Sequence, residues 1–237
     1  MSTFLQLCSK LRQKTIDVGT GPTTVVSQVG QLGKIVTAID DAWVELQQER
    51  EDWRWMRKSF TVPTVASTGE YAYNATSLVD TVSLAAITRF GRWYQDKFTC
   101  YLTATGVSAE YQLFWMEWDT FKRLYRFGTQ TDGQPAYVSI DPTGKFCLGP
   151  KPDAVYTVKG DYQIGPQIMS DADDPDAAIP EMPTRFHGLI TYRGMIKYGL
   201  NAVAPEAIQE GDIEGIRLRN ALELDQLPGM QWGDPLA

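Results

Sequence analysis

The sequence has little of the side chains that most metal centres and acid–base catalysts use. Among its 237 residues there is a single histidine, His187, so a histidine-rich metal centre is excluded. A catalytic triad would depend on that one side chain, and the G-x-S-x-G motif that positions a hydrolase serine is absent. Because a general base needs a positioned nucleophile, we interpret His187 as a packing or surface residue near the first turn of a helix, and we expect no enzyme activity and no cofactor.

Cysteine is also scarce, and long apolar runs are missing. The three cysteines, Cys8, Cys100 and Cys147, are odd in number, widely spaced and without a C-x-x-C pair. This argues against a disulfide framework or a cysteine zinc site. No apolar run reaches transmembrane length, and the first 14 residues lack the apolar stretch of a signal peptide. We therefore expect a reduced protein made in the cytoplasm, without membrane association.

Basic residues are outnumbered by acidic ones. There are 22 Lys and Arg against 29 Asp and Glu, a formal charge of −7. An acidic surface repels duplex phosphate and so disfavours tight DNA binding. The same charge would suit a channel wall past which DNA slides without adhering. The segment 30–34 resembles a phosphate loop only in part, because Gln28 and Ile35 break the G-x-x-x-x-G-K-[ST] spacing.

Two further clusters have an alternative functional interpretation. The acidic loop 171–181 contains four aspartates, yet it lacks the glycine and the bidentate glutamate of a calcium loop. We interpret it as a solvated loop, with divalent binding left open. The run 53–58 mixes tryptophan with arginine and lysine, as single-stranded nucleic-acid sites do. In an acidic chain we favour a strand junction with one buried aromatic face.

Apolar spacing predicts helices at both ends of the chain. The first includes residues 4–11, and the second covers 27–50 with Ser27 as its N-cap. Six residues of the second form a narrow apolar seam, the type that packs against another helix: Val29, Leu32, Val36, Ile39, Trp43 and Leu46. Two more helices are predicted at about 186–200 and 205–224, the last with Ile208, Ile216 and Leu222 facing inward.

The middle of the chain has β character. Strands are predicted from Trp53 to Val62 and, with alternating or β-branched patterns, at 70–73, 84–90, 98–102, 111–114, 136–140, 146–148 and 156–164. A short helix is expected after Asp119. Asp141-Pro142-Thr143-Gly144 has the residue preferences of a type I turn, which predicts a hairpin.

These elements predict an α+β fold, in which an antiparallel β domain, sandwich-like or barrel-like, is inserted into a helical one. The expected boundaries are 1–52 and 180–225 for the helical domain and 53–179 for the β domain. Residues 226–237, rich in Gly and Pro, are expected to form an extended C-terminal tail.

Several motifs, in this order along the chain, resemble those of tailed-bacteriophage head-to-tail adaptor proteins. They are residues 19–26 (GTGPTTVV), the helix ending at Ala42-Trp43, residues 52–57 (DWRWMR), residues 118–125 (WDTFKRLY), residues 148–152 (LGPKP) and residues 178–183 (AIPEMP). The similarity covers roughly residues 3–204.

The resemblance implies a structural virion protein at the head–tail junction, in the neck. Such adaptors bind the portal protein as a ring, expected to be twelvefold. They extend the channel through which double-stranded DNA passes at ejection, and they offer a platform to tail or nozzle proteins. For this chain, the resemblance implies that the seam of the second helix forms the ring interface, with Val29, Leu32, Val36, Ile39, Trp43 and Leu46. It also implies that residues 205–237 dock on the portal. The apolar anchors there would be Leu222, Leu224, Leu227, Met230, Trp232 and Leu236. The β insertion would face outward or towards the tail.

Two other functions compete with this interpretation. One is a distal tail-completion protein at the far end of the neck. The other is a carbohydrate-binding or hydrolytic virion protein in which Trp93, Tyr94 and Trp115 stack on sugars, and which would need two carboxylates converging in a cleft.

Overall fold

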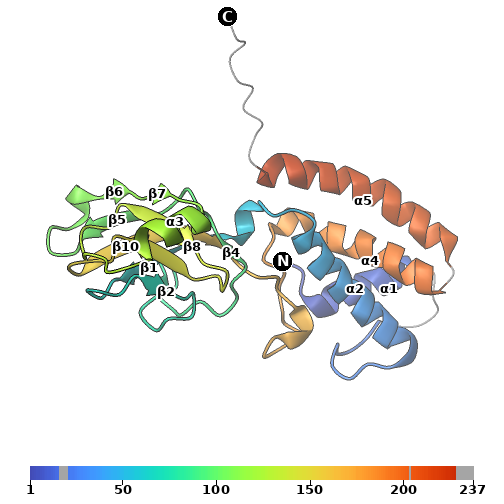
Figure 1. Cartoon of the computed structure of the whole chain (residues 1–237). Helices are drawn as coiled ribbons and strands as arrows, with labels where there is room; N and C mark the ends of the chain where they lie inside the picture. Colours follow the sequence, from blue (N-terminus) through green and yellow to red (C-terminus); the bar gives the residue numbers. More distant parts are fainter. Residues whose placement is uncertain (16–20, 203, 228–237) are drawn as a thin grey trace, which may run out of the picture. The chain divides into compact units, whose positions relative to one another are not determined.

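The computed structural model describes residues 1–15, 21–202 and 204–227 (Figure 1). The chain divides into two compact units, one formed by residues 1–56 and 166–237 and the other by Arg57–Gly165. We call them the helical unit and the β unit. The predicted α+β class is confirmed.

The unit boundaries differ from the expected ones, 52/53 and 179/180, on both sides of the β unit. Trp53 is fully buried, and its indole Nε1 donates to the carbonyl of Leu46 at 3.0 Å, which ties it to the helical unit. On the other side, Asp40 accepts a hydrogen bond from the backbone of Met169 at 3.0 Å. Residues 53–56 and 166–179 therefore lie with the helices. Gln226, expected in the tail, is the last residue of a helix, and residues 228–237 lie outside the described residues.

The described part of the helical unit contains four α-helices and three short 3-10 turns. Their bounds are α1 (Phe4–Lys14), α2 (Gly30–Gln48), α4 (His187–Ala202) and α5 (Pro205–Gln226), with η1 (Arg54–Met56), η3 (Met169–Asp171) and η4 (Thr184–Phe186). Helix α4 is central, because α1, α2 and α5 all pack against it. The core between them is made of Phe4, Leu7, Leu11, Ile35, Ile39, Trp43, Leu46, Leu189, Ile190 and Met195.

Local chemistry explains how two of these helices begin. Thr3 caps α1 through a capping box, in which its hydroxyl accepts from the amide of Gln6 and the Gln6 side chain accepts from the amide of Thr3. Helix α2 begins at Gly30, so the predicted N-cap Ser27 was wrong. Ser27 has a φ of 55°, a left-handed conformation that a helix cannot continue, and Val29 occupies the N-cap position without a side-chain cap.

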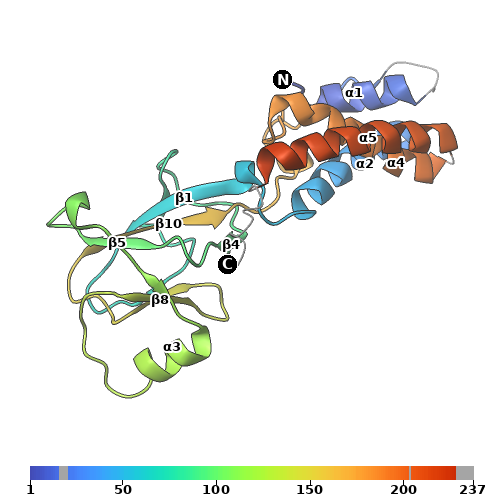
Figure 2. The ribbon, with the colours of Figure 1, turned by 90° about the horizontal axis from the view of Figure 1, so that it is seen from above.

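The β unit is built on two sheets. Its elements are β1 (Arg57–Pro63), β2 (Glu70–Tyr71), β3 (Val79–Asp80), β4 (Arg92–Trp93), β5 (Thr99–Leu102), η2 (Val107–Ala109), β6 (Tyr111–Gln112), β7 (Phe114–Trp115), α3 (Trp118–Tyr125), β8 (Tyr137–Ile140), β9 (Phe146–Gly149) and β10 (Tyr156–Gln163). One sheet has the order β3-β1-β10-β5-β6, with β4 also on β10, and the other has the order β2-β9-β8-β7. The β7–β8 pair is parallel and all other pairs are antiparallel. Figure 2 shows α3 beside β8.

The predicted hairpin between β8 and β9 is confirmed. Ile140 pairs with Phe146, and the Gly144 amide donates to the Asp141 carbonyl at 3.0 Å. The Asp141 carboxylate also accepts from the amides of Thr143 and Lys145, at 2.8 and 2.9 Å. Gly144 has a φ of 81°, so the turn requires glycine there.

Three local predictions were wrong. Residues 84–90 do not form a strand, because Leu84 has a φ of 56° and the chain turns around Asp80. The strand predicted from Trp53 begins instead at Arg57, since residues 54–56 form a 3-10 turn in which Trp53 and Trp55 stack with ring centroids 4.5 Å apart. Helix α3 is capped by Glu117, one residue before the helix, and not by Asp119.

An aromatic cluster fills the interior of the β unit. Phe60 is fully buried at its centre, with ring centroids 4.8 Å from Trp93, 5.6 Å from Phe98 and 5.8 Å from Phe146. Gly160 on β10 lies beneath the Phe60 ring, where an added Cβ would be 2.8 Å from Cε1. The ring of Phe60 on β1 thus occupies the space that a side chain at Gly160 on the paired strand β10 would need.

Candidate interaction surface

Helix α5 packs closely on α4 along a face of small residues (Figures 1 and 2). A Cβ added at Gly211 would lie 2.7 Å from the backbone oxygen of Tyr192 and 2.9 Å from Cγ1 of Ile196. Gly215, one turn later, is also buried, and Leu222 completes the same face. The missing side chains allow the two helix backbones to approach each other at this crossing.

The opposite face of α5 carries apolar side chains that the described residues leave exposed. Ile213 is 61% exposed, Ile216 is 58% exposed and Leu224 is 88% exposed. Their spacing of three and eight residues places them on one side of the helix. An exposed group of large aliphatic side chains marks a contact surface more often than a free one. This face is therefore the first candidate for assembly.

Ion pairs link α5 to α2, and α2 to α4. Glu49 on the C-cap of α2 accepts from Arg193 on α4 at 2.9 Å and also pairs with Arg219 on α5. Arg50 pairs with Glu223 at 3.1 Å. Each pair is partly solvated, so its contribution to stability is small. Their joint effect is to orient the guanidinium groups of Arg193 and Arg219 toward the same carboxylate.

A hollow of about 270 Å³ lies between α4 and α5, beside this network. Its lining includes Arg193, Ile196, Asp212, Gly215, Ile216 and Arg219. The walls thus combine two guanidinium groups, one carboxylate and two isoleucines. Among the lining residues there is no nucleophile and no pair of carboxylates, so the chemistry suits an apolar or aromatic anchor with charged neighbours better than a reaction.

The seam predicted for ring contact belongs largely to the interior of this chain. Ile39, Trp43 and Leu46 are buried, and Trp43 Nε1 donates to Gln167 at 3.1 Å. The nomination of these three for the ring interface is corrected, because they are buried within their own chain, where α2 packs against α4. Val29 is exposed, and Leu32 and Val36 are half-buried, so these three keep accessible area.

The residues nominated for portal docking are divided in the same way. Leu224 is exposed and Leu227 half-buried, whereas Leu222 is buried against the rest of the helical unit. Met230, Trp232 and Leu236 lie outside the described residues. Ile216, predicted to face inward, is instead exposed, and so is Ile213, which lies three residues before it.

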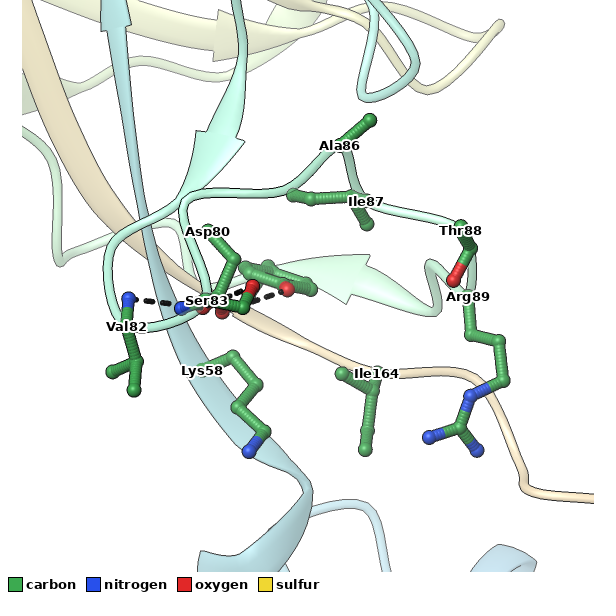
Figure 3. Close-up of a pocket in the computed structure, with 10 residues that line it drawn as sticks. Lys58, Asp80, Val82, Ser83, Ala86, Ile87, Thr88, Arg89 and Ile164 are labelled. Carbon is green, nitrogen blue, oxygen red and sulfur yellow. Dashed lines mark hydrogen bonds between the residues drawn. The ribbon is translucent and has the colours of Figure 1, made fainter.

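The β unit has a second hollow, of about 210 Å³, whose lining includes Lys58, Asp80, Arg89 and Ile164 (Figure 3). Asp80 Oδ1 accepts from the amides of Val82 and Ser83 at 2.9 and 2.8 Å, and Oδ2 accepts from the hydroxyl of Tyr162 at 3.2 Å. Burial alone would raise the pKa of Asp80, but these hydrogen bonds outweigh it and hold the pKa below its usual value. Asp80 thus stabilises a loop, and its oxygens are already satisfied.

The acidic loop of residues 171–181 has structural contacts. Asp176 accepts a hydrogen bond from the amide of Val25 at 2.6 Å, and Asp174 accepts from the amide of Ala177 at 3.3 Å. Within residues 1–15, 21–202 and 204–227, no three His, Cys, Asp or Glu side chains come together as metal ligands. The run 53–58 likewise offers no exposed stacking platform at Trp53, which is buried.

His187 is a packing residue, one of the two alternatives left open for it. It is buried, its Nδ1 accepts from the amide of Ser2 at 3.3 Å, and its Nε2 lies 3.1 Å from the carbonyl of Met182. Because a carbonyl only accepts, the ring is neutral with its proton on Nε2. Burial lowers the pKa of His187 below the usual value of a histidine.

We expect this histidine to make the protein less stable in mild acid. The unfolded chain binds a proton at higher pH than the folded chain does, so stability is complete above about pH 6.5 and falls as the pH drops below it, toward the lowered folded pKa. Urea unfolding of the native protein and of His187→Gln at pH 7.5 and pH 5 measures this. The native protein should lose more stability than the variant; an equal loss in both would contradict the assignment.

Comparison with known proteins places the whole arrangement in a family. No helix among the described residues is both long and apolar enough to cross a membrane. No curated protein matches the chain significantly. The family model for the SU10 adaptor protein matches residues 2–225, which include both units and helix α5 almost to its end. The chain therefore belongs to the SU10 adaptor protein family, whose members are structural adaptor proteins of phages.

Proposed function

We propose that this protein is a head-to-tail adaptor of a tailed phage. In this proposal it forms a twelvefold ring on the portal protein, extends the DNA channel and offers a platform to tail proteins. The observation that supports it most is the outward apolar face of α5, which is accessible on a unit whose own core is complete. Family membership is consistent with an assembly role for that face.

The distribution of charge supports a channel function. The helical unit, residues 1–56 and 166–237, contains 11 Lys and Arg against 19 Asp and Glu, whereas residues 57–165 contain 11 against 10. The acidity of the chain is thus concentrated in the helical unit, at −8, and the β unit is close to neutral, at +1. A ring whose inner wall comes from the helical unit would repel duplex phosphate and let DNA pass without adhering.

The end of α5 is the element we assign to the portal. Leu224 is the most exposed of its apolar residues, and the half-buried Leu227 follows directly after the helix. A helix face that carries aliphatic anchors at helical spacing binds in a groove of a partner protein. The residues after Leu227 would extend that contact.

Co-sedimentation with the portal ring of the same phage tests the proposal. We expect the full-length chain to sediment with the portal, and a version ending at Leu224 to lose most of this binding while keeping its helical circular dichroism. Val82→Ser, a change at an exposed residue of the β unit, is the matched control and should bind normally. If the full-length chain stays in the supernatant, the adaptor role is wrong, and the distal-neck and carbohydrate-binding alternatives gain weight.

The free protein is expected to be a monomer that assembles only on the portal. Binding energy that only the portal supplies would delay ring formation until the portal is present. Size-exclusion chromatography with light scattering decides this: a stable ring in the absence of portal contradicts this order of assembly.

A further inference from the structure

Ten residues of the sequence follow Leu227, the residue directly after helix α5. We call these residues, 228–237, the C-terminal segment; they lie outside the described residues. The segment contains one acidic side chain, Asp234, and no Lys or Arg. Its large apolar side chains are Met230, Trp232 and Leu236. The free energy of the segment is therefore lowered by a surface that removes these three side chains from water.

The helical unit of the same chain offers such a surface. Ile216 lines the hollow between α4 and α5 and is also 58% exposed, so it joins the hollow to the outer apolar face of α5. The lining contains two guanidinium groups, Arg193 and Arg219, and one carboxylate, Asp212. Both arginines contact Glu49, yet a guanidinium has five N–H donors, more than one carboxylate accepts. The hollow can therefore hold an apolar side chain, with one further acidic group at its rim.

The C-terminal segment is long enough to reach this surface. Ile216 lies 11 residues before Leu227 (227 − 216), which is about 17 Å along the helix axis at about 1.5 Å per residue. Pro228-Gly229 has the preferred central residues of a type II turn, which reverses the chain direction. From Met230 to Leu236 an extended chain covers about 20 Å at about 3.3 Å per residue. A segment that turns at Pro228-Gly229 and runs back along α5 therefore brings Leu236 to the height of Ile216.

The same register pairs the other side chains of the segment with residues of α5. Successive side chains of an extended chain alternate, so Trp232, Asp234 and Leu236 share one face. Trp232 would lie about 7 Å beyond Met230, near the height of Leu224, which is 88% exposed. Asp234 would lie about 13 Å beyond Met230, near the height of Arg219. Apolar side chains thus meet apolar ones, and the single carboxylate meets a guanidinium group.

We propose that the C-terminal segment of the free protein folds back on α5 of its own chain, with Leu236 at the hollow beside Ile216. The occupant belongs to the same chain because the segment is joined directly to the helix. Such a short tether gives an effective concentration in the millimolar range, far above that of a second copy in dilute solution. In the proposed function the portal would have to displace this segment from α5; that consequence alone rests on the proposed function.

Disulfide formation within the free, full-length chain tests the contact. One variant carries Ile216→Cys together with Leu236→Cys and is oxidised gently at low protein concentration, without portal. The native cysteines interfere little, because all three are buried and burial raises the pKa of Cys100 and Cys147 to about 11. Mass spectrometry and a non-reducing gel separate a disulfide within one chain from a disulfide between two chains. We expect the disulfide within one chain.

The matched control is Ala221→Cys together with Leu236→Cys. Ala221 is exposed and lies only six residues before Leu227, so a segment that does not bind α5 would reach it at least as easily as it reaches position 216. It lies about 140° around the helix from Ile216, on the side away from the hollow. We expect the 216–236 disulfide to form at least about tenfold faster than the 221–236 disulfide, because only a bound segment raises the local concentration of its thiol.

Two further variants of the 216–236 pair identify the side chains that hold the segment. Trp232→Ala should remove most of the rate advantage over the control pair, whereas Gln231→Ala, on the other side of the extended segment, should preserve it. Equal rates for the 216–236 and 221–236 pairs would overturn the contact. A 216–236 disulfide between two chains would also overturn it, in favour of a second copy as the occupant. Because the portal is absent, these outcomes are independent of co-sedimentation, whose failure would reject the proposed function and leave this contact standing.

Discussion

Replacing Phe60 by alanine is expected to destabilise the β unit by about 3–5 kcal/mol, the largest effect of any single change considered. Phe60 is fully buried, and its ring lies within 6 Å of the rings of Trp93, Phe98 and Phe146. Truncation removes its transfer free energy and leaves a cavity, because rings held from both sheets cannot collapse into the space. Urea unfolding followed by near-ultraviolet circular dichroism, which reports packed aromatic rings, should show a midpoint shifted strongly downward.

Phe114 is the matched control for this experiment. It is the same residue type in the same unit, but its ring is mostly exposed at a sheet edge. Phe114→Ala should change the unfolding free energy by no more than about 0.5 kcal/mol. Equal losses for the two variants would show that the aromatic cluster around Phe60 does not form the core of the unit.

Gly211→Ala is expected to destabilise the helical unit although alanine is the better helix former. Without tertiary contacts the change would gain up to about 1 kcal/mol. Here the new Cβ would lie 2.7 Å from a backbone oxygen of Tyr192, which cannot rotate away as a side chain can. Helix α5 must then shift on α4, at an overpacking cost of about 1–3 kcal/mol, so after the propensity gain we expect a net loss of up to about 2 kcal/mol.

Gly215→Ala, one turn along the same helix, should have the opposite sign. Its Cβ would meet its nearest neighbour at 3.8 Å, an ordinary van der Waals distance, so the helix-propensity gain of up to about 1 kcal/mol is retained. Thermal unfolding followed at 222 nm compares the two variants directly. Stabilisation by both substitutions would mean that α4 and α5 do not approach each other closely at Gly211.

Several features were predictable because their causes are local. The β8–β9 hairpin follows from Asp141 and Gly144, whose side-chain hydrogen bonds and positive φ lie within a single turn. Helix α1 follows from its apolar spacing and from a capping box whose two residues, Thr3 and Gln6, are three positions apart. The strand predicted at 84–90 was wrong because its residues are β-branched and apolar, as in a strand. Nothing in that segment indicates that Asp80 accepts hydrogen bonds from the amides of Val82 and Ser83 and so forms a loop before it.

The sequence by itself determined the α+β class, the four helices of the helical unit and the net negative charge of the chain. Periodicity and turn formation depend on residues close together in the sequence, and the net charge depends on composition alone. Only the tertiary structure decided which faces are free. The spacing of Ile39, Trp43 and Leu46 showed that a face is buried but not that α4 of the same chain buries it. Helix α5 packs on α4 through Gly211 and Gly215, which a search for apolar periodicity does not detect, so Ile216, predicted to face inward, lies on the outside. Whether a helix face is buried depends on which element packs against it. Elements distant in the sequence come into contact only in the folded structure.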